Sequence, residues 1–256
     1  MCKSILHYVN NYVHFSYIAP VTIEAAHLLE LEKRHDYIPG TYRTDFIIDK
    51  NNKINPIEIT CRYAFNGFLL SGYLKGLSDN HLLHHPQIIA VDNYTPFIEY
   101  LSSYFGDAKD YCILKGNSKR DEWKHYVPLL KQEGFEVHEI EYDEIGNNID
   151  LLNYAAVFLE MSQNEILGLS IDVQEAIAKS NHLDDLWTIF LIHDIRFFSV
   201  LNNDEFLKEA LTSDGFDIFR DFLIPTFGNA PNQKKISGLL STVLLVKGLM
   251  FTQVLQ

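Results

Sequence analysis

A strand, a helix and a second strand follow one another between residues 110 and 145, and this order constrains the fold more than any other feature. DYCILKG (110–116) is a short apolar run, DEWKHYVPLLKQEG (121–134) is amphipathic, and FEVHEIEYDEI (135–145) alternates. Two strands joined by a crossover helix form a right-handed βαβ unit of a parallel sheet. YAAVFLEM (154–161) adds another apolar strand. The sequence therefore predicts an α/β fold with a parallel sheet.

The periodicity also predicts elements on either side of this unit. Helices are expected at 20–36, 96–105 and 173–181, and a strand or helix at 186–194. Residues 45–48 and 57–61 read as two strands joined by the turn at 49–52, and hence as a hairpin. The polar, His-rich segment 78–86 is the best internal boundary. His81, His84 and His85 could ligate a metal, and His81 and His85 have helical i, i+4 spacing. With neither a third ligand for that pair nor a Glu base nearby, a polar linker is the better interpretation.

Charge and cysteine content restrict the classes of partner and compartment. The formal net charge of -13 opposes binding to nucleic acid or to an anionic membrane. Three cysteines without C-x-x-C spacing predict neither a disulfide framework nor a zinc ribbon, so a reducing cytoplasm is expected. The N-terminal stretch MCKSILHYVNNYVHF lacks the small-residue cleavage site of a signal peptide. We expect a cytoplasmic protein that binds neither nucleic acid nor membranes.

The predicted hairpin carries the sharpest chemical pattern. Glu58, Thr60 and Arg62 alternate onto one face of a strand, with Asp45 within reach across the hairpin. Two carboxylates and a hydroxyl oxygen suit Mg²⁺, and a neighbouring guanidinium suits a phosphate. The alternative is a solvated strand face with an ordinary Arg–Glu pair.

RTDFIIDKNNKINPIEITCRYAFNG resembles the Asp…Glu-Ile-Asn-x-Arg-Phe metal motif of ATP-grasp ligases. Its position before the βαβ region resembles the circularly permuted ATP-grasp group, which includes glutathionylspermidine-synthase-like carboxylate–amine ligases. LWTIFLIHDIRFFSVL is similar to that group's His-Asp-Lys-Arg-Phe segment. The resemblance implies a Rossmann-like pre-ATP-grasp domain at 87–228. It also implies that the N-terminal helix and the hairpin within residues 1–80 are an element of an incomplete ATP-grasp lobe.

The same resemblance implies an ADP-forming ligase that joins a small-molecule carboxylate to an amine through an acyl-phosphate. Mg²⁺ and ATP would be its cofactors once the lobe is completed. The implied roles follow the matching positions: Asp45, Glu58 and Thr60 for the metal, Arg62 for catalysis, and Arg196, His193, Asn66 and Ser71 for substrate.

The end of the chain departs from the ligase pattern. ISGLLSTVLLVKGLMFTQVLQ has neither the expected W-x-x-K strand nor the Gly-rich loop that cradles phosphates. We therefore expect segment 229–256 to be an atypical tail that results from a frameshifted reading. We also expect the chain to be incomplete as a ligase. The alternative is a non-catalytic binding or partner subunit, completed by another chain that supplies the missing lobe. A free-standing Rossmann-like transferase is disfavoured, since only Gly116 follows strand 110–116.

Overall fold

The computed structural model describes residues 2–32, 42–61, 77, 80, 94–117, 123–183 and 185–224. The chain divides into two compact units. The first unit combines residues 1–61 with 185–253, and the second contains residues 62–184 and 254–256. The sequence-based boundaries fall between residues 80 and 87, of which only residue 80 is described, and the tail 229–256 lies outside the described residues.

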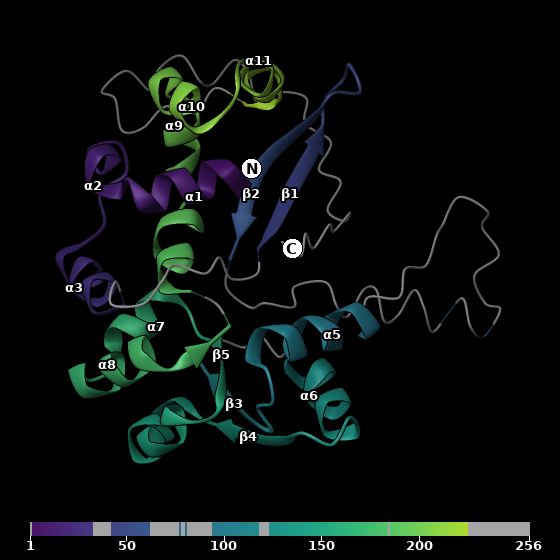
Figure 1. The fold of residues 1–256 in the computed structure, drawn as a ribbon, viewed down its shortest axis with the longest axis vertical. Helices are drawn as coiled ribbons and strands as arrows, with labels where there is room; N and C mark the ends of the chain where they lie inside the picture. Colours follow the sequence, from purple (N-terminus) through teal and green to yellow (C-terminus); the bar gives the residue numbers. More distant parts are fainter. Residues whose placement is uncertain are drawn as a thin grey trace. The chain divides into compact units, whose positions relative to one another are not determined.

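The second unit is built on a four-stranded parallel sheet (Figure 1). Its strands in spatial order are β4 (Glu136–Ile140), β3 (Asp110–Lys115), β5 (Ala156–Glu160) and β6 (Asn181–His182). The predicted βαβ unit is confirmed: α6 (Trp123–Gln132) connects β3 to its parallel neighbour β4. The chain therefore contains a mixed α/β fold with a parallel sheet, as the strand–helix–strand order predicts.

Helices cover both faces of this sheet (Figure 1). On one face, Tyr111 and Ile113 of β3 and Phe158 of β5 pack against apolar side chains of α6 and of α5 (Tyr94–Phe105). Because side chains alternate along a strand, Cys112 and Leu114 project from the other face. There the sheet meets the 3₁₀ helix η1 (Tyr142–Asn153), followed in the chain by α7 (Gln163–Gly168) and α8 (Ile171–Lys179). The predicted strand 135–145 is shorter than expected, since its second half begins η1.

The first unit holds the predicted hairpin, which is confirmed. β1 (Arg43–Ile48) and β2 (Ile54–Thr60) are antiparallel, with a register shift between Asp45 and Phe46. Asp49 shapes the turn, because its Oδ1 accepts hydrogen bonds from the backbone N–H groups of Asn51 (2.8 Å) and Lys53 (2.9 Å). Asn52 has φ 61°, the left-handed conformation that asparagine tolerates better than most residues.

The rest of the first unit is helical. Its elements are α1 (Cys2–Asn10), α2 (Tyr12–Phe15), α3 (Ile23–Glu32), the π-helical turn η2 (Thr188–Ile192), α9 (Phe197–Leu201), α10 (Asp204–Ala210) and α11 (Ser213–Phe222). Segment 186–194 is thus helical rather than a strand. Two buried carboxylates fix the start of this segment: Glu32 accepts from the N–H groups of Leu186 and Trp187, and Asp185 accepts from that of Thr188.

Buried aromatic rings join the helices of the first unit. Tyr8, Phe15, Phe197 and Phe206 are all fully buried. Phe15 of α2 and Phe206 of α10 meet edge to face with centroids 5.1 Å apart, and Tyr8 of α1 lies 5.2 Å from Phe197. No helix in the described part of the chain combines the length and apolar character needed to cross a bilayer.

Candidate functional site

The hairpin brings together the first two predicted metal ligands. Asp45 and Glu58 are direct partners in the β1–β2 register. Thr60 lies opposite Arg43, one alternation further along the same pair of strands. The expectation that Asp45 and Glu58 lie opposite each other across the hairpin is therefore confirmed.

Arg43 forms a bidentate ion pair with the Asp45 carboxylate. The Nε of Arg43 lies 2.7 Å from Oδ1 of Asp45, and Nη2 lies 2.8 Å from Oδ2. The same Nη2 is 3.4 Å from Oγ1 of Thr60, whose side chain is buried. A bidentate pair of this kind engages both carboxylate oxygens, so the Arg43 guanidinium offsets the negative charge of Asp45 within the hairpin. Arg43 is the residue that sequence reasoning missed here, although its i, i+2 spacing from Asp45 places both on one face.

The predicted substrate residues His193 and Arg196 lie after η2. The ring Nδ1 of His193 is 3.2 Å from the backbone N of Cys61, so this imidazole nitrogen accepts a hydrogen bond at the end of β2. Nε of Arg196 donates to Oδ2 of Asp194 at 2.8 Å, and its backbone N donates to Oδ1 at the same distance. The hydrogen bond with Asp194 raises the pKa of the Arg196 guanidinium.

Arg62, Asn66 and Ser71 lie outside the described residues. The metal, catalytic and substrate roles of all eight positions therefore stay predictions. What is established is that Asp45 and Arg196 each have an oppositely charged partner two residues away in the chain.

A second polar site lies at the carboxyl end of β3 and β5 in the second unit. Glu165 of α7 accepts hydrogen bonds from the backbone N of Ser162 (2.6 Å) and of Asn117 (2.7 Å). Oγ of Ser162 in turn accepts a hydrogen bond from the backbone N–H of Glu165, which completes a capping box. A Cβ on Gly116 would lie 2.6 Å from the Glu165 carboxylate, so a larger residue at this position would displace the Glu165 side chain from its present contacts. Glu165 thus fills the space between the loops that follow β3 and β5.

Two further charged side chains at this end of the sheet, Lys115 and Glu160, contact side chains of the same unit. Nζ of Lys115 lies 2.5 Å from Oε1 of Glu141 and 3.9 Å from the centroid of the Trp123 ring. Oε1 of the buried Glu160 accepts a hydrogen bond of 2.6 Å from the Tyr126 hydroxyl. These contacts hold Lys115 and the Oε1 atom of Glu160 against side chains of the same unit.

Helix α11 presents a different surface in the first unit. Asp214, Asp217 and Asp221 recur with Ile218 and Phe222 at spacings of three and four residues, which places all five on one face. Ile218 is 63% exposed and Phe222 is 42% exposed. No residue of the helix is buried. The face therefore combines three carboxylates with two solvent-exposed apolar side chains.

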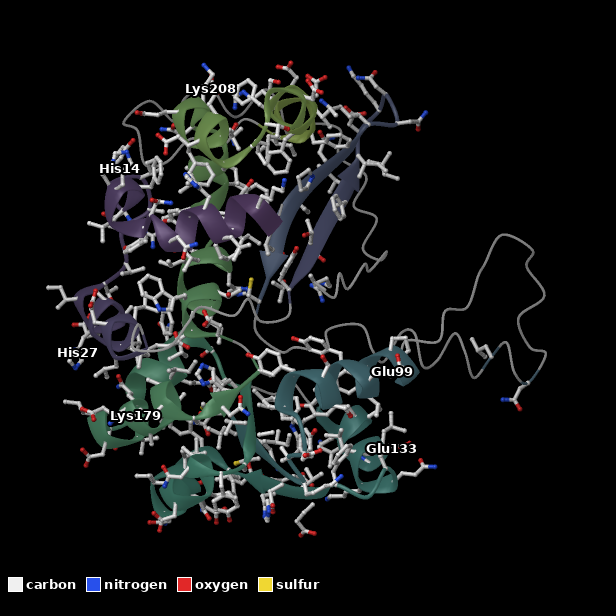
Figure 2. The ribbon with its side chains drawn as sticks, viewed as in Figure 1. His14, His27, Glu99, Glu133, Lys179 and Lys208 are labelled. Atoms are coloured by element: carbon white, nitrogen blue, oxygen red, sulfur yellow. The ribbon has the colours of Figure 1, made fainter. Side chains whose placement is uncertain are left out.

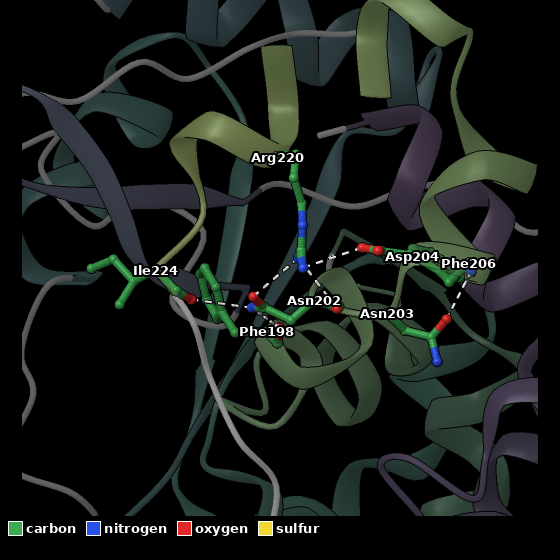
Figure 3. A network of polar contacts seen from close by, with 7 residues as sticks. All are labelled: Phe198, Asn202, Asn203, Asp204, Phe206, Arg220 and Ile224. Atoms are coloured by element: carbon green, nitrogen blue, oxygen red, sulfur yellow. Dashed lines mark hydrogen bonds and ion pairs between the residues drawn. The ribbon is translucent and has the colours of Figure 1, made fainter. Parts of the chain in front are cut away.

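The opposite side of α11 is fixed by a polar network (Figure 3). Arg220 pairs with Asp204 at 3.2 Å, and its Nη1 donates to the backbone O of Asn202 at 3.3 Å. Nδ2 of Asn202 donates in turn to the carbonyl oxygens of Phe198 (2.7 Å) and Ile224 (3.1 Å). This network binds α11 to α9 and α10 and leaves the acidic, apolar face outward. Sequence reasoning missed the face, although the spacing of its aspartates is a readable helical signal.

Comparison with known proteins overturns the ATP-grasp resemblance. The chain matches the family described as AnkG N-terminal domain over residues 3–191, and no curated protein matches it significantly. The ATP-grasp assignment is therefore wrong, and the ligase and circular-permutation descriptions are withdrawn with it. The misleading motif is short, and any antiparallel hairpin with alternating polar residues can place an Asp opposite a Glu. Because the match covers most of the 256 residues, the chain belongs to the AnkG N-terminal domain family.

Proposed function

We propose that this chain is a non-catalytic protein-binding module. Its α11 face would dock a basic, amphipathic segment of a partner protein. The observation that carries the proposal is the stripe of Asp214, Asp217, Ile218, Asp221 and Phe222 on a helix whose other side is fixed. Exposed apolar side chains supply contact area, and the carboxylates select a partner with lysine or arginine beside its apolar residues.

The net negative charge of the whole chain also favours a positively charged partner. With 34 acidic and 21 basic residues, the protein attracts cationic surfaces and repels anionic ones. A partner segment with alternating apolar and basic positions would cover Ile218 and Phe222 while its cations meet the aspartates. The family match ends at residue 191, so this proposal concerns the present chain and not the family as a whole.

The second unit supports a scaffolding role. We propose that its sheet is Rossmann-like. Its parallel strands have the spatial order β4-β3-β5-β6, so the chain adds strands first on one side of β3 and then on the other, and helices cover both faces. Sheets of this kind bind ligands in the crevice at the carboxyl ends of the strands, next to the reversal. Here Glu165 takes the backbone N–H groups that would otherwise meet an anionic ligand. A buried, paired Lys115 likewise offers little free charge to a phosphate.

We also propose a cytoplasmic location, which the cysteine content predicts. Cys61 and Cys112 are both buried and form no disulfide, which suits a reducing compartment.

The test is a binding measurement with a defined probe. Fluorescence anisotropy would follow a labelled amphipathic peptide of lysine and leucine added to the full chain, with a glutamate–leucine peptide as the charge-reversed probe. We expect micromolar binding of the basic peptide. Combining Asp217→Lys with Asp221→Lys should weaken it at least tenfold, because two attractive contacts become repulsive.

The matched control carries the same change of charge elsewhere. Glu99→Lys combined with Glu133→Lys alters exposed carboxylates of the second unit, labelled in Figure 2. This variant should weaken binding less than twofold. Equal weakening by the two double variants would show that net charge alone attracts the peptide, and the α11 proposal would then fail.

A further inference from the structure

Three metal-binding side chains gather on the first unit, away from the α11 face. His14 of α2 and Glu205 and Glu209 of α10 each offer one ligand atom, and these atoms all lie within 4.8 Å of one another. We propose that this cluster binds a divalent transition-metal ion, with Zn²⁺ as the ion of best fit. The proposal concerns residues that the α11 docking face does not use.

The elements that carry the three ligands are held in place by buried neighbours. Phe15 follows His14 directly and Phe206 follows Glu205, and both rings are fully buried against each other. Glu205 and Glu209 are four residues apart on α10, so their side chains lie on one face of that helix. The aromatic contact thus fixes α2 against α10 at the point where imidazole and carboxylates meet. Figure 2 labels His14 on α2 and Lys208 on α10.

An outer hydrogen bond orients one of the carboxylates. Nε2 of His7 lies 3.3 Å from Oε2 of Glu209. The amide Nδ2 of Asn11 lies 3.4 Å from Nδ1 of His7 and 2.9 Å from its backbone oxygen. In the tautomer in which Nδ1 accepts from the Asn11 amide, Nε2 of His7 donates to Glu209. Ligating carboxylates are commonly held by such outer partners, which leaves the other Glu209 oxygen for the ion.

The donor set decides the class of ion. One imidazole nitrogen and two carboxylate oxygens provide the three protein ligands that Zn²⁺ takes in open sites, with water in the fourth position. Mg²⁺ and Ca²⁺ prefer oxygen ligands alone, so the imidazole disfavours them. All three side chains are exposed and can rotate to shorten their separation to bonding distance. The ion would also offset the repulsion between Glu205 and Glu209.

The experiment is calorimetric titration of the tag-free full chain with Zn²⁺, supported by the visible absorption of bound Co²⁺. We expect one ion per chain at micromolar affinity and Co²⁺ bands typical of four-coordination. His14→Gln, Glu205→Gln and Glu209→Gln should each weaken binding at least tenfold. His27→Gln and Glu99→Gln change exposed residues of the same types elsewhere (Figure 2) and should leave it within twofold.

A second variant separates this site from the His-rich segment 78–86. His84→Gln combined with His85→Gln should leave Zn²⁺ affinity unchanged. Loss of binding in that variant, or retention of binding in His14→Gln, would overturn the proposal, as would the failure of wild-type protein to bind Zn²⁺. Saturating Zn²⁺ should raise Tm by about 5 °C in wild-type protein, and not in a folded Glu209→Gln variant. Circular dichroism verifies that each variant is folded.

Discussion

The carboxyl end of the parallel sheet and the face of α11 use acidic residues in opposite ways. At the sheet, Glu165 meets backbone N–H groups, Glu141 meets Lys115, and Glu160 meets a tyrosine hydroxyl. On α11, three aspartates stand beside exposed Ile218 and Phe222. Acidic groups paired inside a unit stabilise its fold, whereas acidic groups next to exposed apolar side chains are available to a partner. Substitutions in the second unit should therefore change stability, and those on the α11 face should change binding.

The largest expected effect comes from the apolar core that underlies the sheet. Phe158 is 1% exposed and packs against Phe105 and Tyr111. Phe158→Ala removes this ring from a close-packed core and should lower the free energy of unfolding by about 3–5 kcal/mol. Urea unfolding of the full chain measures the change. A loss below 1 kcal/mol would mean that the second unit contributes little to the measured stability.

The capping box should give the next largest effect. Glu165→Ala removes the acceptor of the Ser162 and Asn117 N–H groups and should cost about 1–2 kcal/mol in urea unfolding. Glu165→Gln keeps one oxygen acceptor of the same size, so its cost should be smaller. If Glu165→Ala is as stable as wild-type protein, the carboxylate does not hold this end of the sheet.

Alkaline pH should destabilise the second unit through Cys112. Burial raises the pKa of the Cys112 thiol from 9.0 to about 12. The unfolded chain then releases this proton near pH 9 while the folded chain retains it, so stability is complete below pH 9 and falls as pH rises toward 12. The loss at pH 10 should be about 1 kcal/mol. Burial also raises the pKa of Tyr111 to about 12, which adds to the loss above pH 10.

Cys112→Ala isolates the contribution of the thiol. The difference between its urea unfolding free energies at pH 8 and pH 10 should be smaller than that of wild-type protein by about 1 kcal/mol. Identical pH dependence in the two proteins would show that the thiol does not titrate differently in the folded and unfolded chains.

Local periodicity was sufficient for the elements but not for their assembly. The parallel pair at 110–115 and 136–140 and the Asp45–Glu58 juxtaposition follow from alternation and turn chemistry, which are properties of neighbouring residues. By contrast, Glu32 caps the helical segment at Leu186, and Phe15 meets Phe206. Such contacts join distant parts of the chain, and no spacing rule reveals them.

The same distinction applies to the candidate sites. The aspartate spacing on α11 could have been read from the sequence, but its exposure could not, because exposure depends on the Arg220–Asn202 network. The cluster of His14 with Glu205 and Glu209 depends on the packing of α2 against α10. The ATP-grasp motif misled for the converse reason: Asp45 and Glu58 lie opposite each other as expected, yet proximity alone does not define chemistry.

Substitutions on the α11 face should have the smallest effect on stability, in contrast to those in the second unit. Ile218 is 63% exposed, so Ile218→Ser removes little buried surface and should change the free energy of unfolding by less than about 0.5 kcal/mol. The same substitution should weaken binding of the lysine–leucine peptide several-fold, because contact area on the partner is lost. Urea unfolding and anisotropy on one preparation measure both quantities. A large loss of stability would place Ile218 in the fold and not in an interface, and the contrast between the two regions would disappear.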